Sequence, residues 1–442
     1  MSVKIALINS RIDPAGRNIR CHIEQLIEGG QAPAQAHRFT FLETEGRLIA
    51  EDYIDRRTDA DLIFFLSRHA SARPQPVLTM HVSGNFHEAA LGGKEGSLPP
   101  AAPEWMHALL RELSLRAPPA YRVSYESTHH GPTELQTPSL FVEIGSTEKE
   151  WTDPEAGAAV AMSVLSARPV DVIRLIGFGG THYAQRQTEI AGKSRGAFGH
   201  IAPGREVPML DDRLIRRMQQ QTRADAAYID RKALANAEVT RLEKMLRETG
   251  LILLRESDLT AIADLPWETY LQIRRMAEQV DPGAECHIHR MKCDMIPEFF
   301  ELHEELLTEA LKANEAAFVA GLDKIPVVHI STPKKVILPR FITGSGERAQ
   351  VLHDLITLCV KTISHKETIE IAGDQLNIYK SRFDPIIARE LGVTEGPLCG
   401  ELMNGHEIRI GDRFITPAMV RKTMVKKIRI PGLENVTYEV NR

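Results

Sequence analysis

The sequence predicts an α/β domain, with an open mixed or mostly parallel sheet covered by helices, followed by a smaller C-terminal α+β domain. Short apolar runs rich in β-branched and aromatic residues alternate with helical patterns from the N-terminus to Glu256. Several of these runs, such as "DLIFFL" and "DVIRLIG", are apolar at successive positions. That pattern is typical of strands in a sheet that helices cover on both faces.

Each element of the first domain rests on a local signal. We predict strands over residues 3–8, 62–66, 77–82, 121–125, 139–144, 170–176 and 251–256. Asp153 and Pro154 start a helix with a capping carboxylate and a proline in the first turn, and Pro169 ends it. Further helices are predicted over residues 103–117, 210–222 and 236–250, the last ending on a glycine where a C-cap is expected.

The sequence changes in character after Glu256. Residues 264–283 predict a helix and a turn, and residues 297–322 predict one long amphipathic helix. Segments punctuated by proline and glycine follow. We therefore place a boundary at roughly residues 256–285. The expected domains are residues 1–258 and a C-terminal extension over residues 259–442.

Length and composition limit the class of protein. A chain of 442 residues exceeds one ordinary hydrophobic core, and 43% hydrophobic with 26% charged residues indicates a globular fold. The five cysteines are scattered and odd in number, which argues for a reducing compartment and against a disulfide framework. The sequence contains no recognisable signal peptide or membrane span. We expect a cytoplasmic monomer that does not contact membranes.

Polar residues gather at the ends of the predicted strands of the first domain. They are Arg68, His69, His81, Asn85, His129, His130, Glu134, Glu143, Gly179, Gly180, Thr181, His182 and His200. In an open α/β sheet, ligands bind in the crevice beyond the strand ends. We therefore expect these loops to form one site. The stretch "STHHGPTE" is its centre, because Gly131-Pro132 ends any strand and lets a loop aim both preceding imidazoles at one ligand.

Each residue type indicates a role. Catalytic roles are predicted for His129, His130, Glu134 and His182, with the amides of Gly179 and Gly180 stabilising an oxyanion or a phosphate. Substrate-binding roles are predicted for Arg68, His69, Asn85, Thr181 and His200. The metal-ligand candidates are His81, His129, His130, Glu143 and His182, because imidazole and carboxylate suit zinc. A lone histidine at a strand end is more often structural, so it is the convergence of the set that favours a site.

Three motifs point to chemistry that we reject. The glycines at 177–180 depart from the dinucleotide fingerprint because His182 takes the place of the last glycine, which argues against a nicotinamide cofactor. Residues 192–196 fit G-x-S-x-G around Ser194, but their surroundings are polar and loop-like, whereas a nucleophile elbow joins a core strand to a helix. The donors Cys286, His287, His289 and Cys293 follow no common zinc spacing.

Seven segments occur in a characteristic order. They are "SRHAS", "LTMHVSGNF", "GGK", "STHHGPTEL", "PSLFVEIGSTEKEW", "GFGGTHYAQRQT" and "FGHIAP". Together they resemble the archaeal and plant type of D-aminoacyl-tRNA deacylase, and the resemblance runs through most of residues 1–255. It implies a fold similar to nucleoside phosphorylases and bacterial peptidyl-tRNA hydrolases, a zinc cofactor, and tRNA charged with D-amino acids as the partner.

The resemblance also implies a reaction. This is hydrolysis of the ester between a D-amino acid, free or N-modified, and the terminal ribose of tRNA, which requires an activated water. A site shaped around a D side chain would exclude the L epimer by steric clash. Two alternatives stay open: a nucleoside phosphorylase on the same fold, and a tRNA-binding protein without catalysis. The phosphorylase is disfavoured because the sequence offers no basic phosphate clamp near the histidines beyond Arg68.

The C-terminal extension ends in a basic stretch. Its cationic residues are Arg413, Arg421, Lys422, Lys426, Lys427, Arg429 and Arg442, against Glu434 and Glu439. The whole chain carries a formal net charge of -5, so nucleic-acid contact must come from such a local excess. The stretch predicts a contribution to RNA affinity. The alternative is a solvated helix or edge strand.

Overall fold

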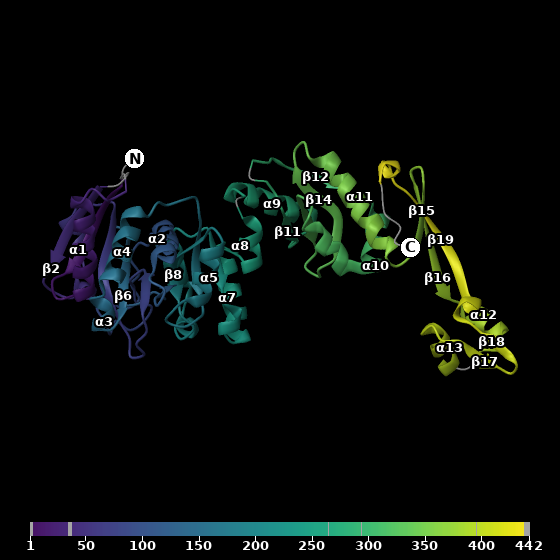
Figure 1. Cartoon of the computed structure of the whole chain (residues 1–442), viewed down its shortest axis with the longest axis horizontal. Helices are drawn as coiled ribbons and strands as arrows, with labels where there is room; N and C mark the ends of the chain where they lie inside the picture. The colour runs from purple at the N-terminus through teal and green to yellow at the C-terminus, as the bar shows by residue number, and fades with distance from the viewer. Residues whose placement is uncertain (1–2, 34–37, 264, 293, 395, 437–442) are drawn as a thin grey trace. The chain divides into compact units, whose positions relative to one another are not determined.

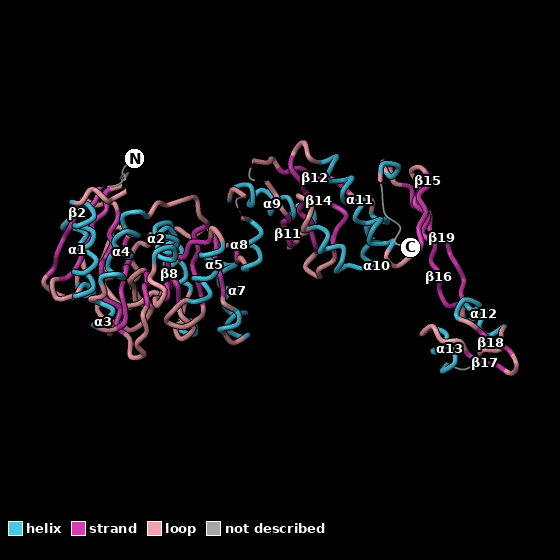
Figure 2. Tube along the Cα trace, in the orientation of Figure 1, coloured by secondary structure: helices cyan, strands magenta, loops and turns pink. Residues whose placement is uncertain are grey.

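The structure is a computed structural model that describes residues 3–33, 38–263, 265–292, 294–394 and 396–436 (Figure 1). The chain divides into two compact units, Met1–Ala263 and Asp264–Arg442. Strands and helices alternate along the first unit, whereas antiparallel strand pairs dominate the sheets of the second (Figure 2). The candidate site residues predicted from the sequence all lie in the first unit.

The first unit contains a six-stranded sheet in the order β2-β1-β3-β6-β4-β5. Its strands are β1 (Lys4–Ser10), β2 (Arg38–Thr44), β3 (Leu62–Ala70), β4 (Val77–His81), β5 (Arg122–Tyr125) and β6 (Ser139–Ser146). Neighbouring strands are parallel except β4 and β6, which are antiparallel. The β4–β6 register sets Thr79 opposite Glu143 and His81 opposite Phe141. In the β3–β6 register His69 lies opposite Gly145. The partner positions 141, 143 and 145 are alternate residues of β6, so these side chains lie along one face of the sheet.

A second, four-stranded sheet in the first unit is entirely parallel, in the order β10-β9-β7-β8. Its strands are β7 (Ile173–Phe178), β8 (Gly196–Ala202), β9 (Ala226–Ile229) and β10 (Ile252–Leu253). An isolated bridge between Glu126 and Tyr183 connects the end of β5 to the loop after β7. The predicted mostly parallel, helix-covered architecture is confirmed, with its strands divided between two sheets.

Helices of the first unit begin and end where local chemistry sets them. They are α1 (Pro14–Glu28), α2 (Pro103–Arg116), α3 (Glu148–Trp151), α4 (Pro154–Ser166), α5 (Gln185–Lys193), α6 (Asp212–Thr222), α7 (Asn236–Thr249) and α8 (Glu256–Ile262). Asp13 and Asp153 each accept main-chain N–H groups of a helix that starts with proline. Gly250 ends α7 at φ +75°, a conformation that glycine adopts without strain.

The central strands of the six-stranded sheet are buried on both faces. Every residue of β6 is buried, as is the run from Leu62 to Ser67 in β3. This matches the apolar runs in the sequence. The few polar groups on these strands, including His69 and Glu143, are also buried, so their partners must be other protein groups or a ligand.

The second unit is α+β, as predicted. Its sheets have the orders β11-β13-β14-β12, β15-β16-β19 and β17-β18, all antiparallel. The strands are β11 (Glu285–His289), β12 (Pro297–Glu301), β13 (Val327–Ser331), β14 (Ile337–Gly344), β15 (Thr368–Ala372), β16 (Gln375–Phe383), β17 (Ile408–Ile410), β18 (Arg413–Ile415) and β19 (Arg421–Arg429). The helices are α9 (Trp267–Val280), α10 (Glu304–Leu322), α11 (Arg348–Ser364), α12 (Pro385–Glu390) and α13 (Gly396–Met403). Within this second unit, one hydrophobic core contains side chains of the β11-β13-β14-β12 sheet, of the β15-β16-β19 sheet, and of α10 and α11.

Two local predictions are wrong. Residues 297–322 do not form one helix, because Pro297–Glu301 pairs with β14 as strand β12 and buries Phe300 in the core. The polar stretch around Ser194 is not a loop, because it contains α5 and leads directly into the buried strand β8. In both cases tertiary pairing outweighs the local pattern.

Candidate active site

The candidate site is built on the loop that follows β5, where the two sheets of the first unit meet. Ser127 N donates to His182 O at 2.8 Å, and Thr128 N donates to Ile201 O at 2.9 Å. Thr128 Oγ1 accepts from Ile201 N at 3.1 Å and lies 3.1 Å from Nδ1 of His200. These bonds attach the loop to β8 and to the segment after β7. The next two residues of the loop, both histidines, are therefore held in place.

Three histidines direct ring nitrogens toward a common point. In His81, His129 and His130, Nδ1 lies 3.2, 2.8 and 2.6 Å from a nearby main-chain carbonyl oxygen. A carbonyl only accepts, so Nδ1 carries a proton in each ring, and Nε2 is the nitrogen that offers a lone pair when the ring is neutral. One nitrogen from each ring lies within 4.8 Å of the other two. Imidazoles oriented by hydrogen bonds of this kind are the usual ligands of a protein-bound metal.

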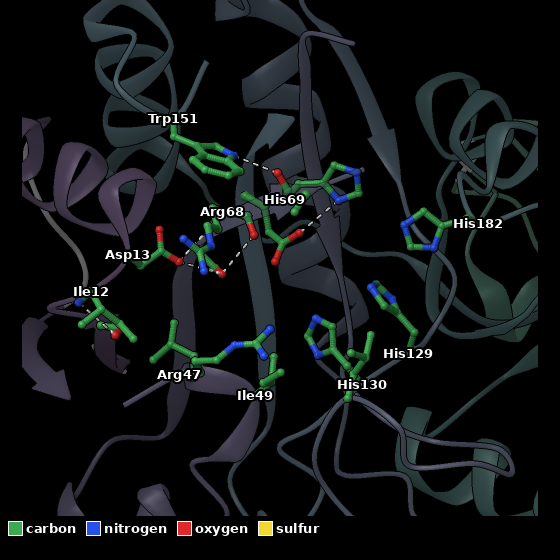
Figure 3. Close-up of a pocket in the computed structure, with 16 residues that line it drawn as sticks. Ile12, Asp13, Arg47, Ile49, Arg68, His69, His129, His130, Trp151 and His182 are labelled. Carbon is green, nitrogen blue, oxygen red and sulfur yellow. Dashed lines mark hydrogen bonds and ion pairs between the residues drawn. The ribbon is translucent and has the colours of Figure 1, made fainter. Parts of the chain in front are cut away.

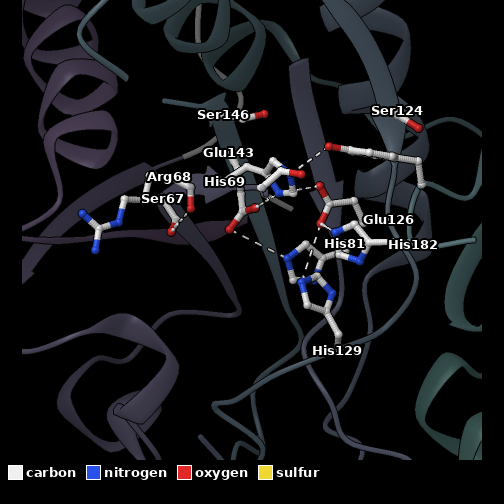
Figure 4. Close-up of polar contacts among 12 residues, drawn as sticks. Ser67, Arg68, His69, His81, Ser124, Glu126, His129, Glu143, Ser146 and His182 are labelled. Carbon is white, nitrogen blue, oxygen red and sulfur yellow. Dashed lines mark hydrogen bonds and ion pairs between the residues drawn. The ribbon is translucent and has the colours of Figure 1, made fainter. Parts of the chain in front are cut away.

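Glu126 forms a second grouping with His69 and His182 (Figure 4). Its Oε1 is 2.9 Å from Nδ1 of His69, and its Oε2 is 3.2 Å from Nε2 of His182 and 3.6 Å from Nε2 of His129. Within the described residues, neither oxygen has a partner that meets hydrogen-bond geometry, although the side chain is fully buried. Leaving a buried carboxylate in that state is costly. The grouping therefore suits a bound cation or water.

Glu143 connects the two groupings. Its Oε2 is 3.6 Å from Nδ1 of His69, and its Oε1 is 3.8 Å from Nε2 of His81. His81, Glu126 and Glu143 offer donor atoms that all lie within 4.8 Å of one another. The cluster thus combines imidazole and carboxylate ligands in one buried volume.

Burial and the neighbouring carboxylates set the protonation of the imidazoles. Burial lowers the pKa of His129 well below its usual range and the pKa of His130 to about 4, so both are neutral. Burial opposes the charged form of His69 too, but the adjacent carboxylates raise its pKa to about 11 and make it a cation. Burial opposes the charged form of His81 as well, but Glu143, Glu126 and the carbonyl of Val82 together raise its pKa. A metal ion binding at His81 would displace that proton.

The carboxylates of the cluster are ionised. Burial alone would raise the pKa of Glu126, but the imidazoles of His182 and His69 hold it well below the usual range. The pKa of Glu143 is lowered for the same reason, by His69 and His81 against the effect of burial. The site therefore presents the neutral imidazoles of His129 and His130 beside buried anions, which suits a divalent cation once the proton on His81 is displaced.

Two cavities adjoin the cluster. One has a volume of about 380 Å³ and is lined by residues that include Asp13, Arg47, Arg68, His69, Glu143, Trp151 and His182 (Figure 3). The other has a volume of about 460 Å³ and is lined by residues that include Asn85, Phe86, His87, Glu88, Arg205, Glu206 and Met209. Leu91, His129 and His130 line both. The histidine pair therefore lies where the two cavities meet.

Several predicted site residues lie close to this centre. His69, His81, His129, His130, Glu143 and His182 belong to the groupings described above. Arg68 lines the first cavity. Asn85 lines the second and donates to Gly92 O at 2.9 Å.

The structure places His200 behind the loop rather than in a cavity. The residue is fully buried, and its Nε2 lies 2.9 Å from Pro99 O while its Nδ1 lies 3.1 Å from Thr128 Oγ1. Because the Pro99 carbonyl only accepts, Nε2 carries the proton and Nδ1 accepts from the Thr128 hydroxyl. His200 therefore stabilises the loop that carries His129 and His130 through its hydrogen bond with Thr128.

The remaining predicted residues lie outside the cluster and line neither cavity. Glu134 forms an ion pair with Lys94 at 2.8 Å and accepts from Ser97 Oγ at 3.1 Å. The N–H of Gly179 donates to Ala202 O, so it is already used and is not free to bind an oxyanion. Its neighbour Gly180 and the exposed Thr181 follow in the same loop.

Sequence reasoning missed Glu126, Arg47 and Trp151. Glu126 follows the buried Tyr125 at the end of β5 and directly precedes the "STHH" segment. A carboxylate in that position could have indicated a site residue. Arg47 has no local signal, because only the fold brings it to the first cavity. Trp151 ends the segment "PSLFVEIGSTEKEW" but was given no role of its own.

Among the described residues, the other sequence motifs form neither a nucleophile elbow nor a metal-binding grouping. Ser194 lies between a helix and a strand, the reverse of a nucleophile elbow. His287 and His289 share one face of β11, and His289 is bonded to Asp323 and His329. Cys293 lies outside the described residues. The metal-binding groupings found among those residues include none of these donors.

Of the basic C-terminal stretch, Arg413 lies in β18 and residues 421–429 form β19, an edge strand. Lys426 pairs with Glu305 and Glu309, and Arg429 pairs with Asp374. Arg421, Lys422 and Lys427 are exposed. Arg442 and Glu439 lie outside the described residues. An RNA contact here stays a prediction.

Among the helices of the described residues, none is both long and apolar enough to cross a bilayer. The fold and the site define an α/β protein with a cluster of imidazoles and carboxylates that could bind a metal, placed between two cavities. Residues 56–254 match the family model described as D-aminoacyl-tRNA deacylase.

Whole-chain comparisons agree. A protein of Methanoculleus marisnigri named D-aminoacyl-tRNA deacylase is 49% identical, over 98% of this chain and 99% of its own length. One of the same name from Methanoregula boonei is 47% identical over 98% of this chain and 100% of its own length. This chain belongs to the D-aminoacyl-tRNA deacylase family.

Other relatives match a smaller share of the chain. A D-aminoacyl-tRNA deacylase of Methanosarcina barkeri is 37% identical over 58% of this chain and 90% of its own length. A crystal structure described as a conserved protein of unknown function, AF0625, is similar at a TM-score of 0.54 and 32% identity, over 59% of this chain and 97% of that one. These two proteins are matched over nearly all of their own length but cover less than two thirds of this chain, so they are shorter than it.

Proposed function

We propose that this protein hydrolyses the ester bond of D-aminoacyl-tRNA and releases a free D-amino acid and tRNA. The observation that carries the proposal is the convergence of three imidazole nitrogens beside two buried carboxylates, where two cavities meet. Family membership supplies the substrate class. N-modified D-aminoacyl-tRNA is included, because the modification leaves the ester unchanged.

The donor set fits zinc as the resident metal. Nε2 of His81 and both oxygens of Glu126 are buried without hydrogen-bond partners among the described residues. His81, His129 and His130 would hold the ion, with Glu126 and Glu143 balancing its charge. When bound, zinc would supply Lewis acidity toward the ester carbonyl and the attacking water.

His182 and Glu126 are suited to handle the proton. The side chain of His182 is 32% exposed, more than the other cluster imidazoles, and its Nε2 faces Glu126 at 3.2 Å. Glu126 orients the ring, and Nδ1 is left for water. We assign to His182 the removal of a proton from the attacking water and its return to the ribose oxygen when the ester C–O bond breaks.

The remaining expectations follow from this reaction. An L side chain on the same ester would point to a different wall of the site, so L-aminoacyl-tRNA should be rejected by shape. All cluster residues come from one chain, so a monomer suffices. With a charged tRNA as the proposed substrate, we expect the protein to act in the cytoplasm.

The test is hydrolysis of D-phenylalanyl-tRNA and L-phenylalanyl-tRNA by the full chain, with and without phosphate. We expect release of D-phenylalanine at a rate independent of phosphate, and little release of the L epimer. Release of a free base that requires phosphate would favour the phosphorylase instead. Tight tRNA binding without any release would reduce the protein to a tRNA-binding role.

A further inference from the structure

The two cavities that share His129 and His130 differ in charge. Outside the histidine and carboxylate cluster, the first contains the guanidinium groups of Arg47 and Arg68 and one carboxylate, Asp13. Two carboxylates, Glu88 and Glu206, line the second together with Arg205. The first cavity is therefore suited to an anion and the second to a cation.

Within the described residues, Asp13 forms no side-chain ion pair with the arginines of the first cavity. Its Oδ1 accepts from the N–H groups of Ala15 and Gly16 at 3.0 and 3.1 Å, as the cap of α1. Its Oδ2 accepts from the main-chain N–H of Arg68 at 3.0 Å and from Ser67 Oγ at 3.3 Å. Both carboxylate oxygens thus bind other groups, so among the described residues Asp13 does not hold either guanidinium group away from a ligand.

Arg68 is oriented by an aromatic ring. Its guanidinium carbon lies 5.2 Å from the centre of the Trp151 ring, and Trp151 Nε1 donates to His69 O at 2.8 Å. The ring is therefore anchored to the strand that carries His69. Figure 3 shows Arg68 and Arg47 on the side of the pocket away from His182. An anion between the two arginines would lie beside the catalytic cluster without entering it.

The second cavity has a different lining. Phe86, Ala90 and Met209 supply apolar walls. Glu206 lies 3.0 Å from Nδ1 of His87 and 3.3 Å from Nε of Arg205, and Glu88 is exposed. Apolar walls with nearby carboxylates suit an amino-acid side chain and its α-ammonium group.

We propose that the substrate lies across the His129–His130 pair, with the terminal nucleotide of tRNA in the first cavity and the D-amino acid in the second. Arg47 and Arg68 bind the phosphodiester on the 5′ side of the terminal nucleoside. Glu88 faces the α-ammonium, beside Glu206, which is already paired with His87 and Arg205. The ester then lies at the histidine pair, between the two. This assignment rests on the proposed deacylation and adds the orientation of its substrate.

Three D-phenylalanyl esters test the first cavity: those of adenosine, of adenosine 5′-monophosphate and of tRNA. We expect Arg68→Ala and Arg47→Ala to lower kcat/KM about 10- to 100-fold for the two substrates that carry the phosphate, the range expected for a lost charge-assisted hydrogen bond. The adenosine ester should change less than about threefold, and Arg68→Lys should recover part of the loss. Arg57→Ala is the control, because Arg57 is exposed in the short helix Ile54–Arg57 and lines neither cavity.

The outcomes distinguish a failure of the substrate placement from a failure of the proposed deacylation. Equal losses on all three esters would mean that the arginines only support the fold, and no loss on any would mean that the phosphate lies elsewhere; both overturn the assignment. Failure of the unaltered chain to hydrolyse D-phenylalanyl-tRNA would instead overturn the proposed function itself.

A second comparison tests the second cavity. The double variant Glu88→Gln with Glu206→Gln should lower kcat/KM about tenfold for D-phenylalanyl-tRNA. It should leave N-acetyl-D-phenylalanyl-tRNA nearly unchanged, because that substrate has no α-ammonium. The arginine variants should affect both substrates alike. Equal effects of the double variant on both would place the amino acid outside this cavity and overturn the assignment.

Discussion

Thr128 is the residue through which the fold should control the histidine loop. Its hydroxyl accepts from Ile201 N and donates to Nδ1 of His200, and both partners are fully buried. Thr128→Val keeps the shape and removes both bonds. Each buried group left without a partner costs about 1–3 kcal/mol. We therefore expect the free energy of unfolding to fall by roughly 2–6 kcal/mol, and turnover to fall because His129 and His130 follow directly.

Thr128→Ser is the matched control, because it keeps the hydroxyl and loses one methyl group, at about 1 kcal/mol. Urea unfolding of both variants can be followed by tryptophan fluorescence, since Trp105 and Trp151 lie in the first unit. The serine variant should keep near-normal turnover. If the valine variant were as stable and as active as the serine variant, the bonds would not hold the loop, and the reasoning would be refuted.

Three further predictions follow from the structure. A shortened chain ending at Ala263 should keep deacylation, because the cluster lies within the first unit; a folded but inactive product would show that the second unit completes the site. Purified protein should contain zinc, and chelation should abolish turnover; full activity without metal would leave the imidazoles as the sole catalysts. Burial lowers the pKa of His200 to about 4, so the unfolded chain binds its proton first as pH falls below about 6.5. Stability should decline by roughly 3 kcal/mol between pH 6.5 and 4, and His200→Gln should flatten that slope; an unchanged slope would assign the acid sensitivity elsewhere.

Sequence patterns located most of the cluster because its histidines follow strand ends. Glu126 escaped because its role depends on His69 and His182, which are distant in the sequence. The fold of the six-stranded sheet brings it His69, and the bridge from Glu126 to Tyr183 brings it His182. Glu134 was favoured for its place in the "STHHGPTE" segment. Beyond Gly131-Pro132 the chain leaves the site, and Glu134 pairs with Lys94 instead.

The missed fold elements have equally local reasons. Helix α1 begins with Asp13-Pro14, the same cap and proline that identified the helix at Asp153-Pro154, so this signal was present but not used. Strand β8 could not be recognised from its flanks, because the polar residues around Ser194 suggested a loop. Its burial depends on pairing with β7, which no local pattern encodes.

The central claim is that the histidine loop carries the chemistry. The most direct measurement is single-turnover hydrolysis of D-phenylalanyl-tRNA by the unaltered chain, by His129→Ala and by His130→Ala, with His406→Ala as the control. The side chain of His406 is 68% exposed and bonded to Glu401 in the second unit. We predict a loss of at least about 10²-fold for each loop variant, with folding intact, and no loss for the control. Rates near that of the unaltered chain for both loop variants would contradict the account and leave these imidazoles with a structural role.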